Sequence, residues 1–295
     1  MKNTKTAAPS EDQGVFEKIS YEYYSFTASE RKVADYMLSN PNGMAYLSIS
    51  ELAAACGVAE ATISRFCRRL GYSGFPAFKM AVANASVRHR LPSDNPLSGE
   101  VTSEDSVADI CQKLLTAETE AMSQTMSVLS ADAICHAASL LQSASRVLCM
   151  GQGGSMLIAS EAAHLFSTVS NRFYPVSDSH LQAMAATLMD PTDVIFFFSY
   201  SGSTKAMMET LELAKARQGK VILVTRFPNS PGALLADVVL QCGANENPLQ
   251  SGSVAARIAQ MYLLDVLFSE YSRRDLDRVS ENRAKIADAL LDKHL

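Results

Sequence analysis

The stretch that most limits the possible folds of this chain is an apolar run, Val194-Ile-Phe-Phe-Phe198. A strand that faces solvent on one side alternates apolar and polar residues. An unbroken β-branched and aromatic run therefore predicts a strand buried on both faces, as in a parallel sheet covered by helices. The segment 205–216, which follows after a short turn, is rich in helix formers with apolar residues at helical spacing.

The alternation of strand and helix continues over the C-terminal half. Strands are predicted at 146–150, 172–176, 193–199, 220–225 and 237–241, and helices at about 155–169, 180–189, 203–218 and 252–270. Two further helices, 104–128 and 131–144, lead into this region. The pattern predicts an α/β domain with a five-stranded parallel sheet, whose ligand would lie beyond the C-terminal ends of the strands.

A turn rich in hydroxyl groups, Ser199-Tyr-Ser-Gly-Ser-Thr204, directly follows the central apolar run. It places hydroxyl donors at the start of a helix, where free backbone N–H groups and the helix dipole attract anions. Helix capping and turn formation would explain one such hydroxyl. Several around a glycine exceed what a cap needs, so we expect this turn to bind a phosphate or a similar anion.

The same turn resembles the Ser-x-Ser-Gly-x-Thr motif of sugar isomerase (SIS) domains, which bind phosphosugars. The second loop of that family, a glycine-rich turn ending in serine after the first strand, is matched by Gly151-Gln-Gly-Gly-Ser155. The resemblance implies that hydroxyls and backbone amides of these turns hold the phosphate: Gly151, Gly153, Gly154, Ser155, Ser199, Ser201, Gly202, Ser203 and Thr204. His180 and Glu246, which follow the second and fifth strands, are further candidates for contacting the effector.

Cofactor and metal chemistry find little support. The glycine-rich turn is similar to a dinucleotide fingerprint, but Met156 occupies the third glycine position of G-x-G-x-x-G. The five histidines show no metal-ligand spacing, and the six cysteines never form Cys-x-x-Cys. We therefore expect no cofactor and no metal, and interpret the cysteines as buried thiols of a cytoplasmic protein.

The N-terminal part predicts two short helices joined by a tight turn. A capping box, Thr27-Ala-Ser-Glu30, predicts the start of an earlier helix. A second capping box, Ser48-Ile-Ser-Glu51, opens a helix that stops at Gly57, and the next helix covers 61–70. Its apolar residues Ile63, Phe66, Cys67 and Leu70 form one stripe, which predicts that Thr62, Arg65, Arg68 and Arg69 face outward. The arrangement is typical of a helix-turn-helix, although a generic helical hairpin with a charged, solvated face is the alternative.

Charge is distributed unevenly along the chain. Residues 1–90 carry 11 Lys and Arg against 8 Asp and Glu, whereas the remainder carries 15 against 23. Residues 61–90 contain six basic residues and no acidic one, which indicates a local contact with nucleic acid. We expect Thr62, Ser64 and Arg65 to read bases, and Arg68, Arg69 and Lys79 to contact phosphates.

Residues 28–80, including Arg65-Phe-Cys-Arg-Arg-Leu-Gly-Tyr-Ser-Gly-Phe75, resemble the DNA-binding domain of RpiR-type bacterial regulators. In that family an all-α helix-turn-helix domain is joined to an SIS domain. The resemblance implies a transcriptional regulator, not an enzyme. It would bind double-stranded operator DNA and a phosphorylated sugar, and would assemble as a homodimer or homotetramer through the SIS domain.

Two alternatives remain open. One is a phosphosugar isomerase with an accessory helical domain, which would need an acid/base pair over the sugar carbons; Glu161, His164, His180 and Glu246 are candidates by position. The other is an adaptor that uses the helical domain for protein contacts. The predicted domains are 12–90 (helix-turn-helix), 91–103 (linker), 104–271 (SIS) and 272–295 (C-terminal helical tail). The sequence contains no apolar run of 18 residues, so it predicts no membrane span.

Overall fold

The computed structural model describes residues 14–40, 47–88, 101–243 and 254–291. The chain divides into two compact units. One contains the described residues 122–243 and 256–291, and the other contains the remaining described residues. The division falls within helix α6 (Val107–Val128), which therefore contributes to both units.

The C-terminal unit is built on a five-stranded sheet in which all pairs are parallel. The strand order is β2-β1-β3-β4-β5, which confirms the predicted five-stranded parallel sheet. Each observed strand begins and ends within one residue of its prediction: β1 (Val147–Gly151), β2 (Phe173–Val176), β3 (Val194–Phe198), β4 (Lys220–Thr225) and β5 (Val238–Gln241).

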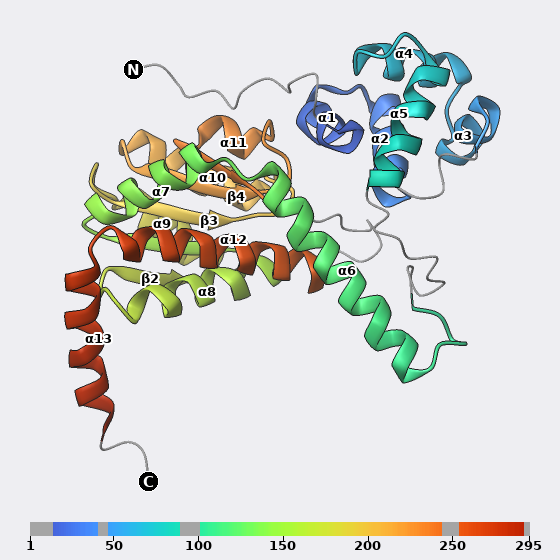
Figure 1. Ribbon diagram of the computed structural model, residues 1–295. Helices are drawn as coiled ribbons and strands as arrows, with labels where there is room; N and C mark the ends of the chain where they lie inside the picture. The colour runs from blue at the N-terminus through green and yellow to red at the C-terminus, as the bar shows by residue number, and fades with distance from the viewer. Residues whose placement is uncertain (1–13, 41–46, 89–100, 244–253, 292–295) are drawn as a thin grey trace. The chain divides into compact units, whose positions relative to one another are not determined.

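Helices cover both faces of this sheet (Figure 1). Helices α7 (Ala131–Ser143), α8 (Gly154–Ser167) and α12 (Val254–Arg273) pack on one face, and α9 (Ser179–Thr187), α10 (Lys205–Ala216) and α11 (Pro231–Leu235) on the other. In β3, Phe196 and Phe198 enter the first core, whereas Ile195 and Phe197 enter the second. Both sides of the strand are dry, and for that reason its sequence shows no polar alternation.

The C-terminal end of α6 packs against the end of β5. The Gly243 N–H donates to the hydroxyl of Thr125, which is fully buried, at 3.0 Å. A Cβ atom at Gly243 would lie 2.3 Å from the carbonyl carbon of Gln124. The two backbones approach so closely that only glycine fits at this position.

The N-terminal unit contains a small helical core. Its helices are α1 (Val15–Glu22), the 3-10 turn η1 (Tyr23–Ser25), α2 (Ala28–Ser39), α3 (Ile49–Cys56), α4 (Glu60–Arg69) and α5 (Phe75–Arg88). Both predicted capping boxes are present, from Thr27 to Glu30 and from Ser48 to Glu51. The core is made of apolar residues from all five α-helices: Ile19, Val33, Met37, Leu52, Ile63, Phe66 and Phe78.

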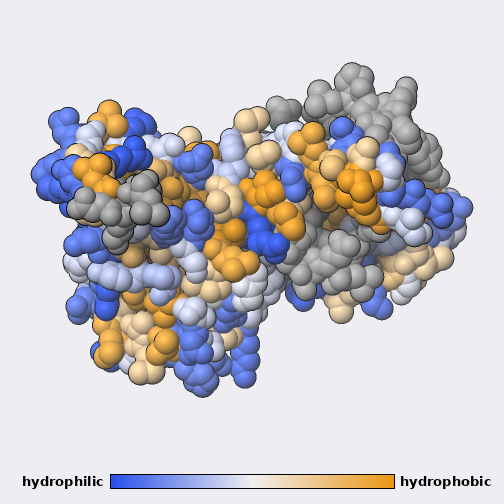
Figure 2. Space-filling model, turned by 90° about the horizontal axis from the view of Figure 1, so that it is seen from below, coloured by the Kyte–Doolittle hydropathy of each residue, from blue (hydrophilic) through white to orange (hydrophobic). Residues whose placement is uncertain are grey.

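The described part of the C-terminal tail is helical, as predicted. Helix α12 continues to Arg273, and α13 (Leu276–Leu290) then runs away from the sheet (Figure 1). Val279 is the buried residue of α13. No helix in the described part of the chain is long and apolar enough to cross a membrane. On the face shown in Figure 2, exposed apolar residues form several separate groups between hydrophilic ones.

Candidate effector site and nucleic-acid interface

The two predicted phosphate loops begin side by side. Strands β1 and β3 are neighbours, and their register pairs Gly151 with Phe198, the last residue of each strand. Chain order reverses at this place in the sheet, because β1 is followed by β2 on one side and β3 lies on the other. Ligands of open parallel sheets bind at such a switch point, beyond the carboxyl ends of the strands.

In the loop after β3, the first two serines shape the turn. The Gly202 N–H donates to the Ser199 hydroxyl at 3.2 Å, and the Ser203 N–H donates to the Ser201 hydroxyl at 3.4 Å. Ser199 is buried and Ser201 is half-buried. These two hydroxyls therefore serve as turn formers, which is the simpler of the two roles considered for them.

The last two hydroxyl residues lie differently. Ser203 and Thr204 are exposed, and Thr204 is the N-cap residue of α10 without a side-chain capping hydrogen bond. Capping therefore does not account for the Thr204 hydroxyl. An exposed hydroxyl beside the first N–H groups of a helix is suited to donate to an anion.

Gly202 is held in a conformation and a space that exclude a side chain. Its φ is +60°, and a Cβ atom there would lie 2.1 Å from the Ser230 hydroxyl oxygen and 2.9 Å from that of Thr225. Its carbonyl accepts a hydrogen bond from the Gly232 N–H at 2.9 Å. The glycine therefore locks this loop onto the segment that follows β4.

Residues 225–232, from the last residue of β4 onward, support the loop. The hydroxyl of Thr225 and the N–H of Arg226 both donate to the carbonyl of Tyr200, at 3.0 and 3.1 Å. The rings of Tyr200 and Phe227 meet edge to face at 5.8 Å. The sequence did not predict these contacts or the short helix α11, because neither segment has hydrophobic periodicity. The start of α11 could have been predicted from Ser230 and Pro231, which are its N-cap residue and the proline of its first turn.

The glycine-rich loop after β1 leads directly into α8. A Cβ at Gly151 would lie 2.6 Å from the carbonyl oxygen of Ser155, so the chain must turn back tightly. Gly153, with φ of +54°, is the N-cap residue of α8, and no side chain caps this helix. Gly154 and Ser155 then form its first turn. Helices α8 and α10 thus follow two adjacent strands, and neither helix has a side-chain cap at its N-terminus.

The remaining effector candidates divide into placed and unplaced residues. His180 lies in the first turn of α9, where the Asp178 side chain caps the helix by accepting from the N–H groups of His180 and Leu181, both at 3.0 Å. Asp178 therefore has a helix-capping role. Glu246 lies outside the described residues.

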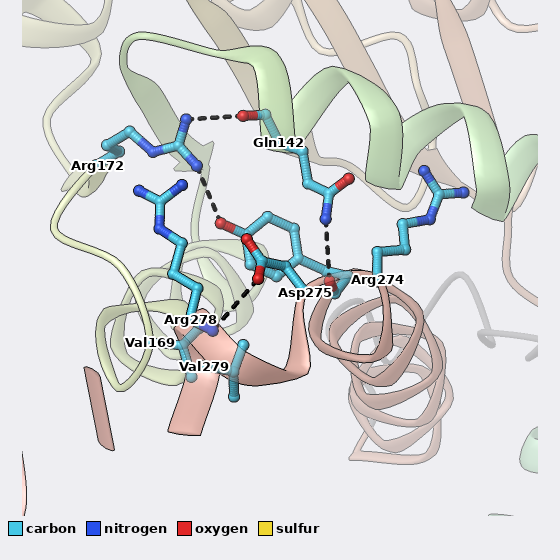
Figure 3. A pocket seen from close by; sticks show the side chains of 8 residues that line it. Gln142, Val169, Arg172, Arg274, Asp275, Arg278 and Val279 are labelled. Atoms are coloured by element: carbon cyan, nitrogen blue, oxygen red, sulfur yellow. Dashed lines mark hydrogen bonds between the residues drawn. The ribbon is translucent and has the colours of Figure 1, made fainter. Parts of the chain in front are cut away.

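A separate pocket lies at the opposite, amino-terminal edge of the sheet (Figure 3). It contains none of the predicted effector residues. Arg172 donates there to the carbonyls of Gln142 and Ala144 and to the hydroxyl of Tyr271, and Arg274 donates to the Ser139 hydroxyl and the Cys135 carbonyl. Arg172 thus joins α7 and α12 to the start of β2, and Arg274 joins α7 to the segment after α12; both are structural roles.

In the N-terminal unit, α3 and α4 form the predicted helix pair. Gly57 ends α3 with φ of +62° and ψ of +42°, and the N–H of Val58 returns to the carbonyl of Ala53. Ile63, Phe66, Cys67 and Leu70 are buried, as predicted. The turn therefore presents α4 as the second helix of a helix-turn-helix.

The prediction that Thr62 faces outward is wrong. Thr62 is only 6% exposed, because it lies one helical turn before Phe66 and shares its buried face. The buried surface of α4 is thus wider than the apolar stripe alone. Ser64 is half-buried, and Arg65 and Arg68 are exposed. A base contact by Thr62 has no support from this position.

Arg69 and Lys79 have partners within the N-terminal unit. Arg69 forms an ion pair with Glu30 at 3.2 Å, donates to the Ser25 carbonyl at 2.6 Å, and lies over the Phe26 ring at 5.5 Å. The ammonium of Lys79 donates to the carbonyl of Leu47 at 2.8 Å. Both cations therefore hold parts of this unit together. Arg65 donates to the Thr62 hydroxyl of its own helix at 3.4 Å, so among the four basic candidates Arg65 and Arg68 are the exposed ones on α4 that are not tied to another segment.

Comparison with known protein families identifies both parts. Residues 13–88 match the helix-turn-helix domain of the rpiR family, and residues 140–270 match the SIS domain. An HTH-type transcriptional regulator of Caldanaerobacter subterraneus is 35% identical over 265 residues, which is 89% of this chain and 93% of the relative. The transcriptional regulator RpiR of Escherichia coli is 28% identical over 259 residues, covering 88% and 86% of the two chains.

Solved structures show the same fold. The Vibrio vulnificus NanR protein, determined in complex with ManNAc-6P, covers 95% of this chain and 98% of its own at 24% identity and a TM-score of 0.61. The sugar isomerase domain of an RpiR transcription factor from Sphaerobacter thermophilus covers 60% of this chain and 97% of its own, at 20% identity and a TM-score of 0.55. The chain therefore belongs to the RpiR family of transcriptional regulators, in which a helix-turn-helix domain precedes an SIS domain.

Proposed function

We propose that this regulator binds operator DNA through α4 and a phosphorylated sugar at the carboxyl ends of β1 and β3, and that the sugar controls its affinity for DNA. The observation that carries the proposal is the pair of helix N-termini without side-chain caps, at Gly153 and Thr204, on adjacent strands. Together with the hydroxyls of Ser155, Ser203 and Thr204, they offer an anion many donors and a favourable dipole. The sugar-phosphate complex of the related NanR protein supports this ligand class.

The coupling is ordinary linkage between two sites. Helix α6 spans the division between the two units, and its C-terminal end is fastened to β5 through Thr125 and Gly243. A change in the effector site that shifts this helix would alter the placement of the helix-turn-helix. Such coupling is worth about 1–3 kcal/mol, or roughly 5- to 150-fold in DNA affinity. DNA titrations with and without the sugar give its sign.

We further propose that the SIS domain assembles a homodimer or homotetramer, which would place two copies of α4 on a palindromic site. The exposed apolar residues on the outer face of α9 support an interface between two SIS domains. Leu181, Met184 and Leu188 are 52, 61 and 74% exposed at spacings of three and four residues, and Tyr174 of the edge strand β2 is 48% exposed. Light scattering on the Leu188→Glu variant tests this face, since a charge there would weaken assembly.

Effector binding is tested by a thermal-shift panel on the full chain, with phosphorylated sugars and amino sugars and their unphosphorylated parents as controls. A ligand at a hundredfold excess over its Kd stabilises the folded protein by about 2.7 kcal/mol. Thr204→Val should weaken the strongest binder about tenfold or more, because a hydrogen bond to a charged group is worth about 1.5–3 kcal/mol. Thr210→Val, which removes a buried hydroxyl from the same helix, is the matched control.

DNA binding is tested by titrating random duplex DNA at several salt concentrations. Each lost phosphate contact should lower the salt slope by about 0.9, so Arg68→Ala should reduce it while Arg217→Ala, an exposed arginine of the other unit, should not. Isomerase activity is the alternative, and incubation of the best-binding sugar with the protein followed by NMR would reveal conversion. A panel without any shift would remove the effector half of the proposal.

A further inference from the structure

Gln182 joins the ends of two strands to a helix on the effector side of the sheet. It is the fourth residue of α9 and is fully buried. Its amide Nε2 donates to the carbonyl of Gly151 at 2.9 Å and to the carbonyl of Val176 at 2.8 Å. These are the last residues of β1 and β2, so one side chain fixes α9 to both strand ends.

The orientation of this amide follows from its partners. Exchanging its oxygen and nitrogen would set an acceptor against two carbonyl oxygens, which is unfavourable. In the observed orientation, Oε1 of Gln182 has no hydrogen-bond partner among the described residues, and neither has the buried Nε2 of Gln152 in the adjoining loop.

Stability alone gives little reason for a glutamine here. An unpaired buried oxygen costs an amount of free energy of the same order as the net gain from a pair of hydrogen bonds. An apolar side chain of similar shape would avoid that cost but would leave the two strand ends unconnected. The feature that only the glutamine supplies is the fixed geometry between α9, β1 and β2.

That geometry concerns two parts of the effector site at once. Gly151 begins the glycine-rich turn, and its carbonyl is the atom that Gln182 holds. Helix α9 carries His180 in its first turn, two residues before Gln182. A movement of the amide would therefore change the distance between the N-terminus of α8 and the first turn of α9.

We propose that Gln182 is a positioning residue of the effector site, which holds the glycine-rich turn and α9 in the arrangement that binds the phosphosugar. This inference rests on the effector function proposed above. Gln182 acts through the carbonyl of Gly151, and the ligand contacts themselves come from the turn.

The test compares two glutamine variants of the full chain. Gln182→Met keeps the shape of the side chain but removes its donor. Gln142→Met is the matched control, because the Gln142 amide likewise donates to a backbone carbonyl, that of Tyr271, but at the opposite edge of the sheet (Figure 3). The probe is the phosphosugar that stabilises the wild type most in the thermal-shift panel, and Kd is measured by calorimetry well below the melting temperature of each variant.

We expect Gln182→Met to raise the Kd about tenfold and Gln142→Met to leave it unchanged, following the usual size of supporting-residue effects. Hydrogen exchange of the amides of 151–156 should accelerate in Gln182→Met only. Equal Kd values for both variants would overturn the role of Gln182 while leaving the effector function intact. If no phosphosugar binds the wild type, the effector function itself falls, and the role of Gln182 falls with it. Should Gln182→Met not fold, Gln182→Leu, which is also apolar and lacks the donor, replaces it with the same expectation.

Discussion

Replacing Gly202 by alanine tests how the loop after β3 is held. The φ of +60° places this residue in the left-handed region, which costs an alanine about 1–2 kcal/mol. The new Cβ would also lie 2.1 Å from the Ser230 hydroxyl oxygen, 2.6 Å from the Ser230 Cβ and 2.9 Å from the Thr225 hydroxyl oxygen. Forcing a carbon into such a space typically costs about 1–3 kcal/mol.

Together the two effects should destabilise the C-terminal unit by about 2–5 kcal/mol, which is a large part of the usual stability of about 5–15 kcal/mol. Gly57→Ala separates them. Gly57 has nearly the same φ, +62°, but no atom lies within 4 Å of the place that an alanine Cβ would occupy there. It should therefore show the conformational cost alone, and in the N-terminal unit.

Buried thiols provide a separate reporter for each unit. Cys149 in β1 and Cys67 in α4 are both fully buried, so each is labelled only when its own unit opens. Labelling across a urea gradient, followed by peptide mass spectrometry, gives the stability of each unit without treating the whole chain as two-state. Gly202→Ala should lower the midpoint at Cys149 and leave that at Cys67 unchanged.

A second substitution sharpens the test. Ser230→Gly removes the two atoms nearest to the new Cβ, so it should recover part of the loss caused by Gly202→Ala. It also removes the cap of α11, and this cost is measured in the single variant. If Gly202→Ala loses no more stability than Gly57→Ala, or if Ser230→Gly gives no recovery, the close packing of the loop against residues 225–232 is refuted.

Three further predictions concern charge and thiols. Arg69→Met should destabilise the N-terminal unit by about 1 kcal/mol, read at Cys67, because it loses a backbone hydrogen bond and a half-exposed ion pair. Arg68→Met, at an exposed position of the same helix, should leave stability unchanged, and equal effects would contradict the structural role of Arg69. Burial opposes ionisation of Asp237, but hydrogen bonds and charges from its neighbours outweigh it and lower its pKa. The stabilisation by this carboxylate is therefore present above its unfolded pKa of about 3.9 and lost as pH falls through the lower folded value. Asp237→Asn should thus flatten the decline of the melting temperature in acid, followed by circular dichroism. Parallel profiles would argue against the ion pair that Asp237 forms with Lys215 at 2.8 Å. In the native protein a thiol reagent should modify Cys111 and Cys135, which are exposed, and spare the four buried thiols. Burial raises the pKa of two of these to about 11 and about 12, those of Cys56 and Cys67. Rapid labelling of any buried thiol would contradict the core described for its unit.

Much of the fold was predictable because its signals are local. The unbroken apolar run Val194–Phe198 indicates a strand that is buried on both faces, and such a strand occurs in a sheet covered by helices on both sides. The capping boxes at Thr27 and Ser48 mark helix starts through hydrogen bonds within four residues, and each is formed as expected. Gly57 ends α3 because its left-handed conformation is inexpensive only for glycine. The ligand contacts assigned to the phosphate loops stay predictions.

The individual roles of polar residues were less predictable, since they depend on distant partners. The apolar stripe of α4 omits Thr62 and so predicts it outside, but the other helices of the unit cover a wider face. The free cysteines show the same effect: four are buried and two, Cys111 and Cys135, are exposed, so the expectation of buried thiols holds for only part of the set.

Local sequence was enough to place the parallel sheet, the helix pair and the two loops that are predicted to bind phosphate, because hydrophobic periodicity, capping residues and glycines act over a few neighbours. The tertiary structure alone decided which hydroxyls and cations are already engaged. Ser199 is bound to its own turn, Arg69 to a residue 39 positions earlier in the chain, and Gly202 to a segment beyond the next strand. The physical reason is that a hydrogen bond or a collision depends on distance in space, and pairs so far apart in the chain meet only after the helices and strands have packed.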